Sequence, residues 1–179
     1  MILIKEQTIH KLHKARTAHI RSLNSVKLLV SGLQFQEDQF QLGQTETAFG
    51  KWFHEEAMLF SNSNSRIQLE TMEKLLLQLH DHFTTIYQIF FGTSTGGVMG
   101  FFGKKHKPSD AEKELAKRLY DEMVGFSDQL KQKLRVFESQ LNSMPEEKFT
   151  ELIYTPEETP LVAAIKEDTN QYHFGARGH

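Results

Sequence analysis

Residues 109–142 read SDAEKELAKRLYDEMVGFSDQLKQKLRVFESQLN, and apolar side chains recur in this stretch every three or four positions. Such spacing places the apolar side chains on one face of an α-helix, where they form a seam that other helices must cover. Ser109 and Glu112 have the spacing of a capping box, which predicts the start of this helix. The predicted seam consists of Leu115, Leu119, Met123, Phe126, Leu130, Leu134, Phe137 and Leu141.

Three segments before this helix show the same helical spacing of apolar side chains. They are residues 4–33, 46–60 and 67–91. A shorter helix is predicted over residues 145–153, after Pro145. No segment shows the alternation of apolar and polar residues that is typical of a strand.

The connection over residues 92–108 is rich in glycine, with five glycines in the twelve positions 92–103. An interior glycine costs a helix about 1 kcal/mol relative to alanine, so this segment is predicted to interrupt the helices. We therefore predict an all-α fold, an antiparallel four-helix bundle with a long Gly-rich connection before the last long helix and a short C-terminal helical appendage. Residues 1–153 would form the bundle, and residues 154–179 a partly disordered tail.

Composition limits the chemistry of this chain. It has 179 residues, 21 Lys and Arg against 23 Asp and Glu, nine histidines and no cysteine. The net charge of -2 provides no global basic field for binding nucleic acid. Without a thiol, a transition-metal site would have to use imidazole and oxygen ligands. No apolar run reaches the roughly 18 residues of a membrane span, and the N-terminus lacks a signal-peptide pattern, so we expect a soluble cytoplasmic protein.

Three histidines lie on or beside apolar helix faces. His19 is central on the apolar face of residues 4–33, and a lone histidine in such a place is more often a hydrogen-bonded core residue than a ligand. His80 and His82 are two residues apart, so they diverge by about 200° around a helix and only one can share a site with His19. The other histidines are assigned to polar faces, loops or the tail: His10, His13, His54, His106, His173 and His179.

Residues 47–52 read TAFGKW, with a glycine beside two large aromatic side chains. A glycine at this place indicates a tight helix start or a close backbone approach. A buried Trp52 should find a partner for its indole N–H. On composition alone, this stretch is predicted to be a packing motif.

Three of these stretches together resemble the chemoreceptor zinc-binding domain. They are Ala18-His19 on the first helix, Thr-x-Phe-Gly-x-Trp at residues 47–52, and Leu76-x-x-x-His80 on the third helix. The resemblance covers roughly residues 10–92 by motif and the last long helix by topology. It implies a four-helix bundle of the kind found in bacterial chemoreceptors and diguanylate cyclases, and also as stand-alone proteins. That family carries a three-His, one-Cys zinc site.

The chain departs from that family at two ligand positions. Thr47 stands in the place of the cysteine, and Thr84 in the place of the second histidine of the third helix. A register with His82 as the second histidine puts Gln78 in the first place and still lacks a ligand. Threonine hydroxyls stay protonated and are poor zinc ligands. We expect a degenerate metal site at His19 and His80 that binds zinc weakly or not at all; the alternatives are a His/Thr hydrogen-bonded network or a site for another ligand.

The function expected from this resemblance is a non-enzymatic regulatory or sensory bundle that acts through protein contacts in bacterial signal transduction, such as chemotaxis. A homodimer is expected because the family tends to dimerise and the long seam of residues 109–142 could extend an interface. One alternative is a metal- or haem-binding bundle that senses or carries oxygen or redox equivalents; a di-iron form needs Glu-x-x-His pairs, which the sequence lacks. Another is a purely structural interaction module.

Overall fold

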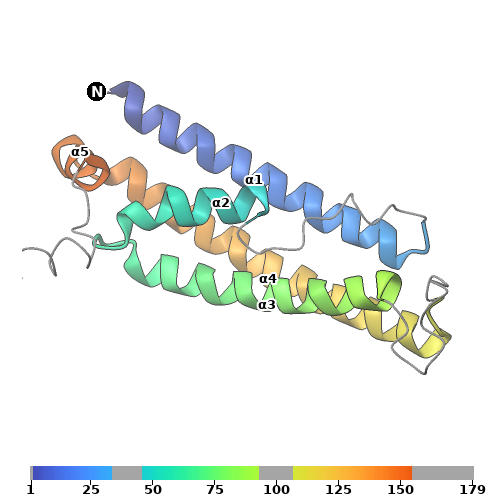
Figure 1. Ribbon diagram of the computed structural model, residues 1–179. Coiled ribbons are helices and arrows are strands. Elements are labelled where there is room, and N and C mark those ends of the chain that lie inside the picture. The colour runs from blue at the N-terminus through green and yellow to red at the C-terminus, as the bar shows by residue number, and fades with distance from the viewer. Residues whose placement is uncertain (1, 34–45, 93–106, 155–179) are drawn as a thin grey trace, which may run out of the picture.

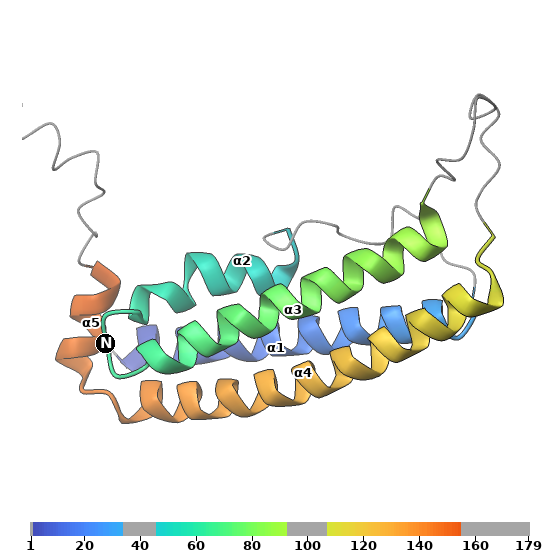
Figure 2. The same cartoon turned by 90° about the horizontal axis from the view of Figure 1, so that it is seen from below.

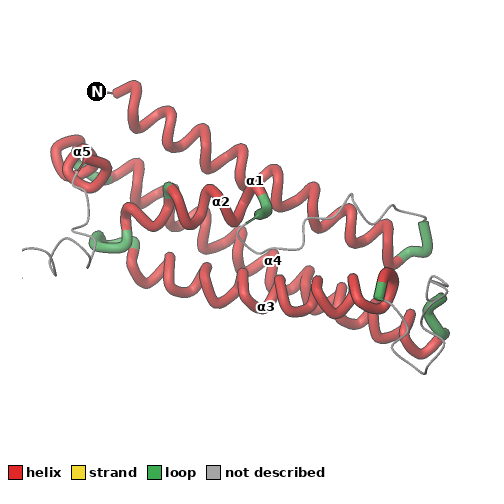
Figure 3. The backbone as a smooth tube through the Cα atoms, viewed as in Figure 1, coloured by secondary structure: helices red, strands yellow, loops and turns green. Residues whose placement is uncertain are grey.

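The computed structural model describes residues 2–33, 46–92 and 107–154. Within these ranges every regular element is a helix, so the predicted all-α class is confirmed (Figure 3). The elements are α1 (Ile2–Val30), α2 (Ala48–Glu55), the 3₁₀ helix η2 (Ala57–Phe60), α3 (Arg66–Phe91), α4 (Asp110–Ser143) and α5 (Glu146–Tyr154).

The three long helices extend along one common direction of the molecule (Figures 1 and 2). The chain runs one way in α1 and α3 and the opposite way in α4, while the shorter α2 and η2 lead back to the end where α3 begins (Figure 1). α3 packs along α4, and α1 packs against both α4 and α2. α5 lies across one end of the long helices, in contact with η2 and α1. A cavity between α1, α2, α3 and α4 is therefore bordered by segments far apart in the sequence.

The start of α4 is the predicted capping box. The Ser109 hydroxyl accepts a hydrogen bond from the Glu112 backbone N–H at 3.3 Å, and the Glu112 carboxylate accepts one from the Ser109 backbone N–H at 2.8 Å. Each side chain thus satisfies a backbone group that has no partner inside the helix. The predicted start of this helix is confirmed.

α1 ends at Val30 rather than at residue 33. Gly32 has a φ of 86°, the left-handed conformation that terminates many helices. The Leu33 backbone N–H donates to the carbonyl of Leu28 at 3.2 Å, and that of Gly32 donates to Leu29 at 3.0 Å. These two bonds form a Schellman motif. Because Gly32 is the residue that leaves the helical conformation, the longer helix predicted from apolar spacing was wrong at its end.

The segment predicted as one helix over residues 46–60 is divided at Glu56. This residue has φ -121° and ψ -49°, and a 3₁₀ turn follows it. Side chains three residues apart are in line on a 3₁₀ helix, so the turn directs both Ala57 and Phe60 into the core, where each is 1% exposed. Leu59, which lies between them, is exposed.

The buried face of α4 differs from the predicted seam at three positions. Ala116 and Ser127 are buried, whereas Leu115 is exposed and Leu119 and Phe126 are only partly buried. From Met123 onward the buried residues alternate by four and three positions, a pattern that includes a serine and that large apolar residues alone do not reveal. The buried residues of α4 are Ala116, Met123, Ser127, Leu130, Leu134, Phe137 and Leu141.

Most of the Gly-rich connection and the predicted tail lie outside the described residues, which omit 93–106 and 155–179. The same holds for His106, His173 and His179. Among the residues that are described, no helix combines the length and the apolar character needed to cross a membrane.

Candidate functional site

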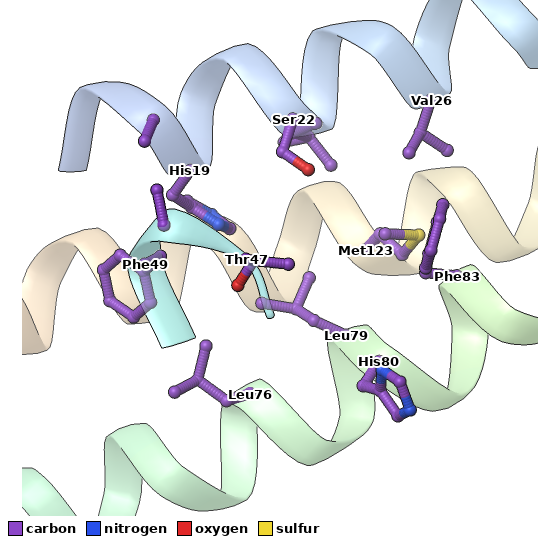
Figure 4. Close-up of a pocket in the computed structure, with 13 residues that line it drawn as sticks. His19, Ser22, Val26, Thr47, Phe49, Leu76, Leu79, His80, Phe83 and Met123 are labelled. Carbon is purple, nitrogen blue, oxygen red and sulfur yellow. The ribbon is translucent and has the colours of Figure 1, made fainter. Parts of the chain in front are cut away.

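A cavity of about 170 Å³ lies where α1, the start of α2, α3 and α4 meet (Figure 4). It receives His19 from α1, Thr47 from the start of α2 and His80 from α3, so three of the four motif positions singled out in the sequence border one space. The fourth, Thr84, does not line it, and its neighbour Phe83 does. The lining residues are Ala18, His19, Ser22, Leu23, Val26, Thr47, Ala48, Phe49, Leu76, Leu79, His80, Phe83 and Met123.

His19 is buried and hydrogen-bonded. Its side chain is 9% exposed, its Nε2 atom lies 2.8 Å from the Ser127 hydroxyl oxygen, and its ring packs at 5.5 Å on that of Phe49. Burial, together with the smaller effect of the positive charge of Lys131, lowers the pKa of His19 from 6.5 to about 4. The imidazole is therefore neutral at neutral pH. This is the form that binds metal ions or accepts a hydrogen bond.

Thr47 serves as the N-cap of α2. It has extended backbone geometry, and its hydroxyl oxygen accepts a hydrogen bond from the Gly50 backbone N–H at 2.9 Å. A capping side chain satisfies one of the unpaired amides at a helix start, which explains a threonine here without any ligand. The polar network of the cavity thus differs from the expected His/Thr pair, because the observed partner of His19 is Ser127.

His80 reaches the cavity from α3, on the side opposite α1, and is half-buried. In Figure 4 the side chains of Leu76 and Leu79 point from α3 toward α2, whereas the ring of His80 points away from His19. A closed zinc site uses four protein donors. The described residues contain no group of three or more His, Asp or Glu side chains that could hold a metal ion. The donor set therefore does not fit the closed zinc site that the family resemblance implies.

The other described histidines have different surroundings. His82 lies 2.7 Å from the Glu122 carboxylate across the α3–α4 interface, and His13 lies 2.6 Å from Glu138 across α1 and α4. His10 and His54 are exposed. None of these four side chains lines the cavity, so His80 is the only member of the His80/His82 pair that shares a space with His19.

Trp52 anchors α2 in the core. It is 6% exposed, with edge-on ring contacts to Phe49 at 5.4 Å and to Phe137 at 6.4 Å. Its Nε1 atom is buried without a hydrogen-bond partner among the described residues, contrary to the expectation from the sequence. The packing role predicted for residues 47–52 is consistent with these contacts.

Sequence reasoning missed Ser127, the hydrogen-bond partner of His19. A serine between Phe126 and Asp128 looks like a surface residue when only large apolar side chains are assigned to the core. Strict alternation of three and four positions through Met123 and Leu130 does place it in the buried seam.

Comparisons with protein-family models, with curated proteins and with solved structures give no match to this chain.

Proposed function

We propose that this protein is a non-enzymatic regulatory or sensory helical bundle, similar to chemoreceptor zinc-binding domains, that acts in the cytoplasm through protein contacts. In this proposal α1, α2 with η2, α3 and α4 are the four helices of an antiparallel bundle. The observation that carries the proposal is the convergence of His19, Thr47 and His80, from three different elements, on one cavity. These are the positions at which the resembling family places zinc ligands.

The site is proposed to be a degenerate form of a metal centre. Two imidazoles remain, and Thr47 replaces a thiolate with a hydroxyl that caps α2. A neutral hydroxyl adds little to zinc affinity, so a pair of histidines completed by water would hold the ion far more weakly than a His/Cys site. Signalling would then depend on the packing of the helices around the cavity rather than on a tightly held ion.

The contact between His19 and Ser127 has the spacing of a base and a nucleophile, but its environment favours a structural role. Ser127 is 1% exposed and does not line the cavity, so a substrate has no path to its hydroxyl through that space. A histidine with a pKa of about 4 is also a weak base at neutral pH. These two facts support a binding or regulatory function over hydrolysis.

The proposal includes a protein partner in signalling and a homodimer, as the resembling family tends to form. Sedimentation velocity of the full chain tests the dimer. A single species with the mass of one chain at all accessible concentrations would contradict it.

The degenerate site is tested by metal content. The full chain is purified without nickel or chelator, and its zinc content is measured by elemental mass spectrometry. We expect well below one zinc ion per chain. Matched samples of His19→Ala and of His10→Ala, an exposed histidine outside the cavity, should give the same low value.

One zinc ion per chain, lost in His19→Ala but retained in His10→Ala, would contradict the degenerate site. A haem absorption band that depends on His19 or His80 would favour the haem alternative, and stoichiometric iron without haem would favour the di-iron alternative.

A further inference from the structure

The lining of the cavity combines apolar surface with a few polar side chains. Among the described residues around it there is no Lys, Arg, Asp or Glu. The polar side chains are those of His19, Ser22, Thr47 and His80, and His19 is neutral at neutral pH. An ion entering this space would lose its hydration without meeting an opposite charge, which is strongly unfavourable. The lining therefore selects uncharged molecules.

The size of the cavity limits the ligand further. Its volume of about 170 Å³ is close to that of an engineered apolar cavity of about 150 Å³ that binds benzene. One aromatic ring, alone or fused to a second small ring, fits such a space. The rings of Phe49 and Phe83, on opposite sides of the lining in Figure 4, offer surfaces for aromatic contacts.

His19 offers a hydrogen bond to a molecule in the cavity. In the described part of the chain its hydrogen bond is the one between Nε2 and the Ser127 hydroxyl, which leaves Nδ1 for a ligand. A neutral imidazole has one nitrogen that donates and one that accepts. Because the Ser127 hydroxyl can take either role, Nδ1 of this cavity-lining residue can act as a donor or as an acceptor.

We propose that this cavity is a binding site for a small uncharged aromatic molecule with one hydrogen-bonding group, such as a phenol or an indole, held by apolar contacts and by Nδ1 of His19. The inference deepens the proposed sensory function and rests on it, because it requires that a metal ion does not fill the site. A ligand here contacts α1, α2, α3 and α4 at once. Binding would favour the packed arrangement of these helices over any looser one, which is the coupling a sensor needs.

The test measures binding of three probes to the metal-free full chain. Phenol is uncharged with a hydroxyl, benzene has the ring without the hydroxyl, and benzoate has the ring with a negative charge. Titration calorimetry and the melting temperature should show saturable binding of one phenol per chain with a raised melting temperature. Benzene should bind about fivefold more weakly, the worth of one hydrogen bond, and benzoate should not bind.

A double variant tests the role of His19. His19→Phe with Ser127→Ala replaces both hydrogen-bonding partners, so no buried polar group is left unpaired. This variant should bind phenol about fivefold more weakly than the unmodified chain while its affinity for benzene stays the same. Equal loss of both affinities, or no loss of phenol affinity, contradicts the assigned role of His19.

A second variant tests whether phenol binds in this cavity. Val26 is 1% exposed and lines the cavity, so the larger side chain of Val26→Phe must extend into that space. It should abolish phenol binding, while Val136→Phe, the same change on the exposed surface of α4, should leave it unchanged. Circular dichroism verifies that both variants are folded.

Unchanged phenol binding in a folded Val26→Phe variant overturns the proposal. So does the absence of phenol and benzene binding in the folded, metal-free chain, or benzoate binding as tight as that of phenol. The proposed function fails in a different way, by one zinc ion per chain that depends on His19, and that result is read from the metal content before any probe is added.

Discussion

His19 is a titratable group in the core, and its environment links folding to pH. Its folded-state pKa is about 4 because burial disfavours the charged imidazole, while an unfolded chain has a value near 6.5. Between these values the unfolded chain binds more protons at this site than the folded chain does. The free energy of unfolding therefore rises with pH across that window, and acidification from pH 6.5 to 4 removes about 3 kcal/mol at this site.

Replacing His19 should flatten this dependence. In His19→Phe with Ser127→Ala, the decrease in the free energy of unfolding between pH 7 and pH 4.5 should be smaller than in the unmodified chain by about 2 kcal/mol. Urea unfolding at the two pH values measures it. His10→Gln, at an exposed position, should keep the dependence of the unmodified chain. The same pH dependence in the double variant and in the unmodified chain would contradict the burial argument.

The sequence was least informative about the contacts that single side chains of the site make. His19 could be placed on a buried face by its spacing alone, because its helix neighbours are apolar. Spacing also places Ser127 in the buried seam of α4, but it does not show that Ser127 bonds to His19, which lies 108 positions away on another helix. The sequence also could not show that Trp52 Nε1 has no hydrogen-bond acceptor among the described residues, because that depends on tertiary packing.

The helix ends are set by local chemistry, and two glycines illustrate opposite cases. Gly32 closes α1 with a φ of 86°, a conformation that is costly for any residue with a Cβ atom. Gly125 lies within α4, where alanine is the better helix former. A Cβ atom at either position would meet nothing within 4 Å, so steric clashes do not affect the comparison.

We expect Gly32→Ala to lower the free energy of unfolding by about 1 kcal/mol and Gly125→Ala to raise it by about 0.5 to 1 kcal/mol. The two variants are controls for each other, because they introduce the same methyl group into open space. Denaturant unfolding of both, with m-values compared, measures the difference. A stabilising Gly32→Ala would show that the Schellman turn does not constrain the end of α1.

At the scale of elements, the sequence predicted the helices more successfully than their breaks. The start of α4 follows from Ser109 and Glu112, which interact with each other and need no other part of the fold. The break at Glu56 could not be predicted, because the 3₁₀ turn after it is favoured by the burial of Ala57 and Phe60 against other elements. A helix end that depends on neighbouring residues can thus be predicted from the sequence, whereas a break that depends on tertiary packing cannot.

In the whole molecule, a chain of aromatic contacts joins elements that are distant in sequence. Phe137 of α4 contacts Trp52 of α2 at 6.4 Å and Phe60 of η2 at 6.0 Å between ring centroids. Phe60 contacts Phe149 of α5 at 5.1 Å. At the other end of this series of contacts, Trp52 contacts Phe49, which packs on His19. The candidate site is therefore connected through aromatic packing to the end of the molecule where α5 lies.

Within this series of aromatic contacts, we expect the loss of Phe137 to destabilise the largest number of elements. Phe137 is 0% exposed, and truncation to alanine would leave a cavity among α2, η2 and α4. We expect Phe137→Ala to lower the free energy of unfolding by about 3 to 5 kcal/mol, the usual cost of removing a buried aromatic ring.

The control is Val136→Ala, one position earlier but 43% exposed, which should change the free energy of unfolding by less than about 0.5 kcal/mol. Because Trp52 is the only tryptophan in the sequence and touches Phe137, its fluorescence reports unfolding of both variants at this contact. Equal destabilisation by the two substitutions would mean that the aromatic chain does not couple these elements, and the packing route from α5 to His19 would then lose its basis.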